Sequence, residues 1–177
     1  MLHRVLAAAA GLALSLAASV PAAKANDRAF FEGVAGVWSG PGKIVAGKYE
    51  GTEFNCTLTG TPAAGAQAGV VMDGTCRVGV FGQEMSATIR QAGDSYEGRF
   101  LDGAAGDGLD IVSGRVEPGR VIMAITRKQL EGVMVATLTG AHSMNVTVSV
   151  QVGETLVPVI GVTLARDIDS VAVGSIR

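Results

Sequence analysis

The stretch MNVTVSVQV, residues 144–152, decides the fold of this chain. Its methionine and valines occupy every second position, and asparagine, threonine, serine and glutamine fill the positions between them. Successive side chains of a β-strand point to opposite faces, so a strand gathers the apolar side chains on one face, whereas a helix would scatter them. The stretch therefore predicts a strand whose polar face either meets solvent or lines a polar lumen.

Similar runs rich in Val, Ile and Thr recur along the chain, separated by many of its 25 glycines. This pattern is typical of short strands joined by tight turns. The Asp73–Gly74 pair predicts a turn that breaks one of these runs, and Glu117-Pro118-Gly119 predicts a hairpin turn. The further strands predicted are 36–40, 43–49, 52–59, 69–80, 85–89, 96–101, 109–117, 120–127, 132–139 and 158–166.

One short helix is predicted, over 27–34, with Asn26 or Asp27 as its cap and an apolar side that includes Phe30 and Phe31. Antiparallel strands in such number usually close on themselves or stack, because open sheet edges invite aggregation. We therefore expect an all-β fold, an antiparallel up-and-down β-barrel of about 8–11 strands with a short N-terminal helix. A β-sandwich is the alternative.

The first residues have the features of an export signal. Arg4 precedes an apolar run over 6–20, Pro21 follows the run, and Ala23-Lys24-Ala25 matches the small-x-small cleavage pattern. The run is shorter than the roughly 20 residues of a membrane-spanning helix. We expect a signal peptide over 1–25, a single domain over 26–177 with no transmembrane span, and a bacterial periplasmic location.

The charge of the chain bears on its partners. The formal net charge is −2, and loss of Arg4 and Lys24 with the signal would make the remainder more acidic. The sequence has no basic run, which argues against nucleic acid and anionic membranes as main partners.

Two cysteines, Cys56 and Cys76, are present, and an even number in an exported chain predicts a disulfide. Their spacing suits neighbouring antiparallel strands. Metal ligation would need further Cys or His nearby, and a redox pair usually has C-x-x-C spacing. We therefore expect a structural disulfide.

The segment Gly36-Val37-Trp38, directly after the predicted helix, resembles the opening of the lipocalins and the wider calycin barrels. The resemblance implies that Trp38 closes one end of the barrel. It also implies that a basic residue at the end of the last strand packs over the indole, and Arg166 is placed to do so as a cation–π partner. The T-D-Y-like second motif of lipocalins is absent.

A second resemblance is to the small calycin-like barrel inhibitors of secreted metalloproteases and their outer-membrane relatives. These proteins share the size, the export signal and the cysteine pair, and they also open near a G-x-W. This resemblance implies binding to a protein.

Few residues suggest catalysis. Beyond the predicted signal the one histidine is His142, at a predicted hairpin tip, and no G-x-S-x-G is present. Paired carboxylates could act in glycosidase chemistry if they faced a lumen together, but a solvated strand face is the simpler interpretation. The candidates are Glu53, Glu84, Glu97 and Asp110.

Metal and cofactor sites are not indicated either. One histidine and two paired cysteines do not make a typical zinc site. Asp102, Asp107 and Asp110 lack the spacing of a calcium loop and are interpreted as turn residues. We expect no catalytic, metal or cofactor-binding residues.

These observations favour a non-catalytic protein of the periplasm or cell envelope that binds a small apolar ligand, a lipid or an envelope component. The alternative is a protease inhibitor or another protein-binding module that uses the loops 61–68 or 101–108. An enzyme acting through carboxylates or His142 is the third possibility. The sequence does not indicate an oligomeric state.

Overall fold

The computed structural model describes residues 22–65, 67–101 and 108–168. One helix, α1 (Ala22–Gly33), precedes ten strands in this part of the chain. The strands are β1 (Gly36–Ile44), β2 (Glu53–Pro62), β3 (Gly69–Val78), β4 (Phe81–Ala92), β5 (Ser95–Leu101), β6 (Leu109–Glu117), β7 (Arg120–Arg127), β8 (Leu130–Leu138), β9 (Ser143–Val152) and β10 (Thr155–Arg166).

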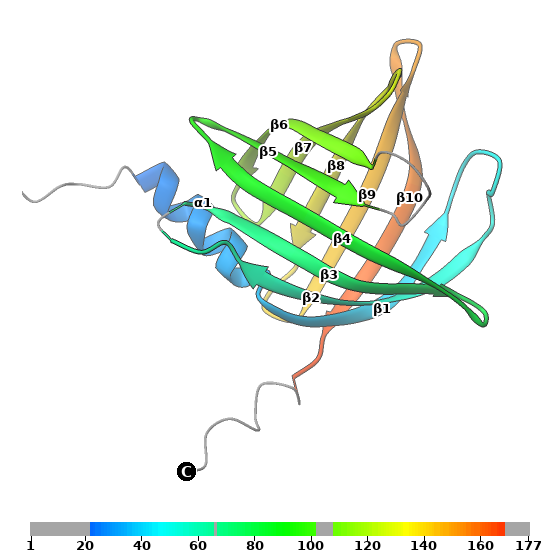
Figure 1. Ribbon diagram of the computed structural model, residues 1–177, viewed down its shortest axis with the longest axis horizontal. Helices are drawn as coiled ribbons and strands as arrows, with labels where there is room; N and C mark the ends of the chain where they lie inside the picture. Colours follow the sequence, from blue (N-terminus) through cyan, green and yellow to red (C-terminus); the bar gives the residue numbers. More distant parts are fainter. Residues whose placement is uncertain (1–21, 66, 102–107, 169–177) are drawn as a thin grey trace, which may run out of the picture.

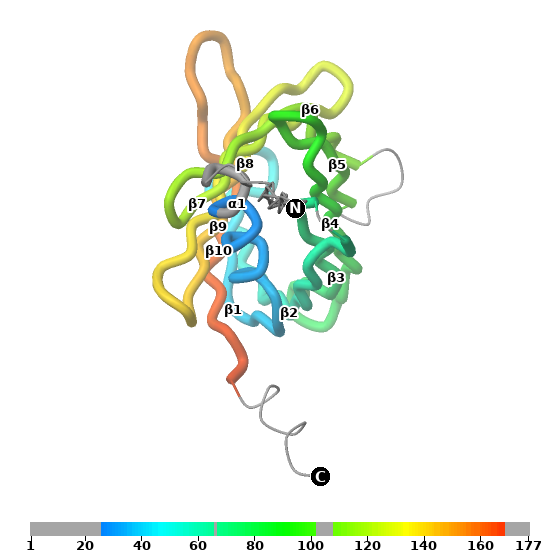
Figure 2. Tube along the Cα trace, turned by 90° about the vertical axis from the view of Figure 1, so that its left-hand side faces the viewer, coloured from blue at the N-terminus to red at the C-terminus, as the bar shows by residue number. Residues whose placement is uncertain are grey.

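The strands form one closed antiparallel barrel (Figure 1). Each strand pairs with its neighbours in sequence, and β1 pairs with β10 to complete the ring. Figure 2 looks onto the end that carries α1 and shows the strands arranged around a common centre. The predicted up-and-down barrel is confirmed, and the sandwich alternative is wrong.

The alternation in β9 determines which face is inside. Met144 is buried, and Val146 and Val148 line the interior, whereas Asn145 and Thr147 are exposed. The polar face of this strand therefore meets solvent, and the barrel has an apolar interior instead of a polar lumen.

The predicted turn at Asp73–Gly74 is wrong, because β3 runs through both residues. Gly74 pairs with Leu58 of β2, and a Cβ atom at Gly74 would lie 2.1 Å from the carbonyl oxygen of Thr57. The glycine allows close approach of two strands, and this requirement resembles a turn signal in the sequence.

Other strand boundaries also differ from the prediction. The strands predicted over 36–40 and 43–49 are one strand, β1, which ends at Ile44. The turn at Glu117-Pro118-Gly119 is confirmed: Glu117 pairs with Arg120, and Gly119 has a φ of 75°. The positive φ of Gly119 is a conformation that glycine adopts at little cost.

The helix is longer than predicted, because it begins at Ala22 and not at Asp27. Residues 22–25 include three alanines, which are the best helix formers. The helix thus spans the predicted cleavage point. Most of the predicted signal, residues 1–21, lies outside the described residues, and cleavage stays a prediction. No described helix has the length and apolar character of a membrane span.

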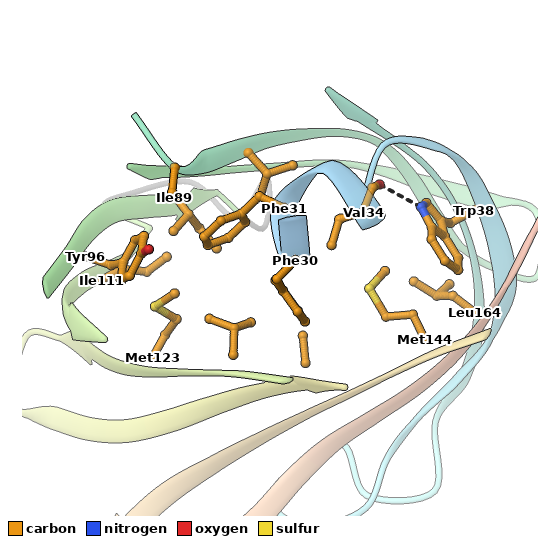
Figure 3. Close-up of a cluster of buried hydrophobic side chains, with 14 of the residues drawn as sticks. Phe30, Phe31, Val34, Trp38, Ile89, Tyr96, Ile111, Met123, Met144 and Leu164 are labelled. Atoms are coloured by element: carbon orange, nitrogen blue, oxygen red, sulfur yellow. Dashed lines mark hydrogen bonds between the residues drawn. The ribbon is translucent and has the colours of Figure 1, made fainter. Parts of the chain in front are cut away.

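The core lies at the barrel end next to α1 (Figure 3). The largest fully buried side chains are Trp38, Tyr96, Phe31, Met123, Leu164 and Val121. Phe30 and Phe31 project from α1 into this cluster, and Val34, just after the helix, joins them, so this segment fills one end of the barrel with apolar side chains.

Candidate functional site

Trp38 and Arg166 lie together where β1 and β10 pair. The indole is fully buried, and its Nε1 donates a hydrogen bond of 2.9 Å to the carbonyl oxygen of Val34 (Figure 3). The guanidinium carbon of Arg166 lies 4.3 Å from the centroid of the Trp38 ring. This is cation–π geometry at the end of the barrel next to α1.

Arg166 also holds three backbone carbonyls. Its Nε donates to the carbonyl oxygen of Ala141 over 2.9 Å, and its two terminal nitrogens donate to the carbonyl oxygens of Ala35 and Gly33. These carbonyls belong to the end of α1, the segment before β1 and the β8–β9 connection. The Arg166 side chain therefore ties the end of α1 to β10, which carries the arginine, and to the β8–β9 connection.

Tyr96 of β5 also holds α1. The Tyr96 hydroxyl donates to Oδ2 of Asp27 over 2.7 Å, and its ring lies 5.4 Å from that of Phe31. Burial raises the pKa of Tyr96 above its ordinary value, and the hydrogen bond to Asp27 raises it further. The hydroxyl is therefore a neutral donor, and this contact is a structural tie.

The rest of the interior is not filled. A cavity of about 180 Å³ lies inside the barrel, next to the core. Its lining comes from every strand from β2 to β10 and includes no residue of α1. The lining residues are Phe54, Cys56, Leu58, Met72, Cys76, Met85, Ser86, Ala87, Phe100, Leu109, Ile111, Ile125, Met134, Val146, Val148, Ile160, Val162 and Leu164.

The lining is almost entirely apolar. Among the described residues that line the cavity, Ser86 alone carries a hydroxyl, and none has a titratable side chain. An apolar cavity of about 150 Å³ stays dry and can bind a compact hydrocarbon such as benzene. The arrangement can remove apolar surface from water, but it offers no acid, base or nucleophile.

The predicted disulfide is confirmed and is part of this wall. Cys56 of β2 and Cys76 of β3 are direct cross-strand partners and are bonded to each other. Both residues line the cavity. The disulfide therefore fixes the register of two adjacent strands at the site.

The carboxylates considered for catalysis do not come together. Glu53, Glu84, Glu97 and Asp110 are all exposed, and none lines the cavity. Glu53 pairs with Lys43 at 3.5 Å, and Asp110 pairs with Arg99 at 3.4 Å.

The remaining polar candidates are also peripheral. His142 is exposed in the β8–β9 connection, where its carbonyl accepts a hydrogen bond from the backbone N–H of Arg166. Asp102 and Asp107 lie outside the described residues. Within the described ranges, no three His, Cys, Asp or Glu residues are grouped as metal ligands would be.

Sequence reasoning missed the cavity itself. The alternation in β2 places Phe54, Cys56 and Leu58 on one face, so the sequence predicts that these side chains point in the same direction. Whether inward side chains meet in the middle depends on how the strands are staggered around the ring, which local patterns do not encode.

The chain matches no protein-family profile and no curated protein sequence. The closed antiparallel barrel fits the general architecture of a calycin-like barrel. The structure therefore defines a class, a closed ten-stranded barrel with a helix at one end and an apolar cavity at the other.

Proposed function

We propose that this protein is a non-catalytic binding protein of the cell envelope whose cavity holds the apolar part of a small ligand, such as an acyl chain. The apolar cavity of about 180 Å³ is the observation that carries the proposal. A protein interior normally leaves few voids larger than a water molecule, so an unfilled space of this size has a cost that a ligand would offset.

The size of the cavity narrows the class of ligand. Pockets for drug-sized molecules measure about 300–1,000 Å³. A slender chain or a single ring suits the smaller space here. A charged group has no partner in the lining, so burying it there would be costly, and a polar head group would remain outside.

The disulfide supports the envelope location. Disulfides persist in oxidising compartments and are rare in the cytosol, and the Cys56–Cys76 bond is part of the barrel wall. The periplasm is the compartment that the N-terminal sequence predicts.

The protein-binding alternative rests on the loops 61–68 and 101–108. Ala68 is buried, and its carbonyl oxygen accepts a hydrogen bond of 2.9 Å from the backbone N–H of Gln91. Part of the first loop is therefore packed on the barrel. The second loop lies almost wholly outside the described residues, and the alternative stays a prediction.

A cavity-filling substitution tests the proposal. Val148 lines the cavity, and its partners in β8 and β10, Met134 and Ile160, line it too. Val148→Phe should occupy the space and weaken binding of cis-parinaric acid, a fluorescent fatty acid, by about tenfold or more. Thr147→Phe is the matched control, because Thr147 is exposed on the other face of the same strand.

The result expected is loss of fluorescence enhancement in Val148→Phe and normal enhancement in Thr147→Phe. Thermal unfolding followed by circular dichroism checks that both fold, and Ala87→Leu gives a second, smaller filling of the same cavity. Equal binding by the wild type and both filled variants would reject the cavity as the site.

A further inference from the structure

The hairpins at the barrel end away from α1 carry many exposed apolar side chains. In an up-and-down barrel alternate connections lie at opposite ends, so the β1–β2, β3–β4, β7–β8 and β9–β10 connections share this end. We call it the mouth. Its exposed large apolar residues are Val45, Tyr49, Val78, Val80, Phe81, Leu101, Leu130, Val152 and Leu156.

Most of the exposed large apolar residues of the described chain lie at the mouth. In the described part of the chain, Val112 and Ile168 are the only other exposed large hydrophobic residues. Val80 and Phe81, at the β3–β4 turn, are 86% and 78% exposed. Val78 is exposed beside them, and a gathering of exposed apolar side chains points to contact with something outside the barrel.

The arrangement of the mouth indicates what it contacts. Figure 1 shows the β1–β2, β3–β4 and β9–β10 hairpins extending in different directions. Their exposed apolar residues lie on or beside several separate turns. A fluid surface can receive several separate turns at once, whereas a folded partner would need a matching pocket for each.

The charges of the mouth favour a surface without net charge. The described connections of the mouth carry two exposed basic residues, Lys48 and Lys128, and two exposed acidic residues, Glu50 and Glu154. Lys48 also lies over the ring of Tyr49, with its Nζ 5.4 Å from the ring centroid. A tyrosine beside a lysine suits the water–lipid boundary, because the ring is apolar at one end and polar at the other.

We propose that the mouth docks on a zwitterionic phospholipid membrane. In this orientation the cavity would face the lipid, and an acyl chain would pass between them with little exposure to water. The transfer of an acyl chain rests on the proposed function, whereas the docking depends only on the exposed residues of the mouth.

Vesicle flotation tests the docking. Protein recovered from the cell envelope, shown by intact mass to lack residues 1–25, is mixed with phosphatidylcholine vesicles at low and high salt. We expect flotation at both salt concentrations, because apolar contacts are not screened. Val80→Ser/Phe81→Ser should weaken binding about tenfold or more. Val112→Ser, on an equally apolar residue that is 58% exposed outside the mouth, should bind like the wild type.

Three results would overturn the docking proposal: wild-type flotation by Val80→Ser/Phe81→Ser, no flotation of the wild type, and flotation only with anionic lipid at low salt. A dimer that the double substitution dissociates, without vesicle binding, would instead assign the mouth to a second copy of the chain. The two proposals fail separately, because Val148→Phe should lose cis-parinaric acid and keep the vesicles, while Val80→Ser/Phe81→Ser should do the reverse.

Discussion

Arg166 contacts several separate segments of the molecule. It stacks on Trp38 and donates hydrogen bonds to the carbonyl oxygens of Gly33, Ala35 and Ala141. Ala35 and Gly33 lie 131 and 133 positions before Arg166, and Ala141 lies 25 positions before it, so the side chain joins segments that nothing local brings together. A carbonyl that loses a charged donor and is left without a partner costs more than a neutral hydrogen bond contributes.

Replacing Arg166 should destabilise the protein markedly. We expect Arg166→Ala to lower the free energy of unfolding by about 2–4 kcal/mol, because three carbonyls and the indole lose one shared donor. Arg166→Lys should restore only part, since an ammonium group lacks the planar fork of guanidinium. Urea unfolding followed by circular dichroism measures both.

Arg99→Ala is the control for this prediction. Arg99 pairs with Asp110 across exposed side chains, and surface pairs of this kind contribute about 0–1 kcal/mol. A loss for Arg166→Ala no larger than that for Arg99→Ala would show that the contacts of Arg166 do not stabilise the fold.

The contact between Trp38 and Arg166 could be anticipated from the resemblance to calycin barrels. That resemblance implies a tryptophan in the first strand and a basic residue at the end of the last strand. The carbonyls could not, because backbone groups have no sequence signature and come within reach of Arg166 only in the closed ring. The same limit applies to the Tyr96–Asp27 hydrogen bond, which joins residues 69 positions apart.

Strands were the elements best predicted from the sequence, because apolar residues at every second position indicate which face of a strand is buried. The alternation over 144–152 predicts β9, and β9 runs from Ser143 to Val152. Two of the errors concern glycine and alanine. Gly74 serves strand packing where a turn was expected, and the alanines before Asn26 extend α1. Small residues permit several structures, so their role is decided by tertiary contacts.

The disulfide supports the β2–β3 pair and can be tested directly. On the chain-entropy model, closing a loop of this size stabilises by about 3 kcal/mol. We expect Cys56→Ala/Cys76→Ala to lower the free energy of unfolding by about 2–4 kcal/mol in urea. Reductant should destabilise the wild type and leave the double variant unchanged. Equal stability of the oxidised wild type and the double variant would contradict the prediction.

The tie between α1 and β5 predicts a dependence on alkaline pH. The folded-state pKa of Tyr96 lies above the ordinary value of 10.0, so the folded state holds the proton more tightly than the unfolded chain. This contribution is complete below pH 10 and is lost progressively as the pH rises above it.

Tyr96→Phe should therefore lose less stability than the wild type between pH 9 and pH 11, about one unit either side of the ordinary tyrosine pKa. Tyr49→Phe is the control, because Tyr49 is 63% exposed and should follow the wild type. Urea unfolding at each pH gives the comparison. Parallel curves for the wild type and Tyr96→Phe would refute the role of the Tyr96 proton.

Taken as a whole, the barrel is packed at one end and hollow at the other. The closed, antiparallel architecture followed from the number of strands and the lack of a long helix, since both indicate a sheet that must cover its own edges. The hollow half did not follow, because volume is a property of the assembled ring. The apolar mouth was equally hidden, since the sequence pattern places Val80 at the end of a predicted strand and Phe81 directly after it.

The pairing of β1 with β10 has a consequence for the folding of the chain. The ring is completed by nearly the first and nearly the last described segments, Gly36–Ile44 and Thr155–Arg166. Until the final strand is available, the nascent sheet has two unsatisfied borders that can recruit other polypeptides. Long-range closure of this kind is slow compared with hairpin formation. The barrel can therefore close only after the last strand has been made.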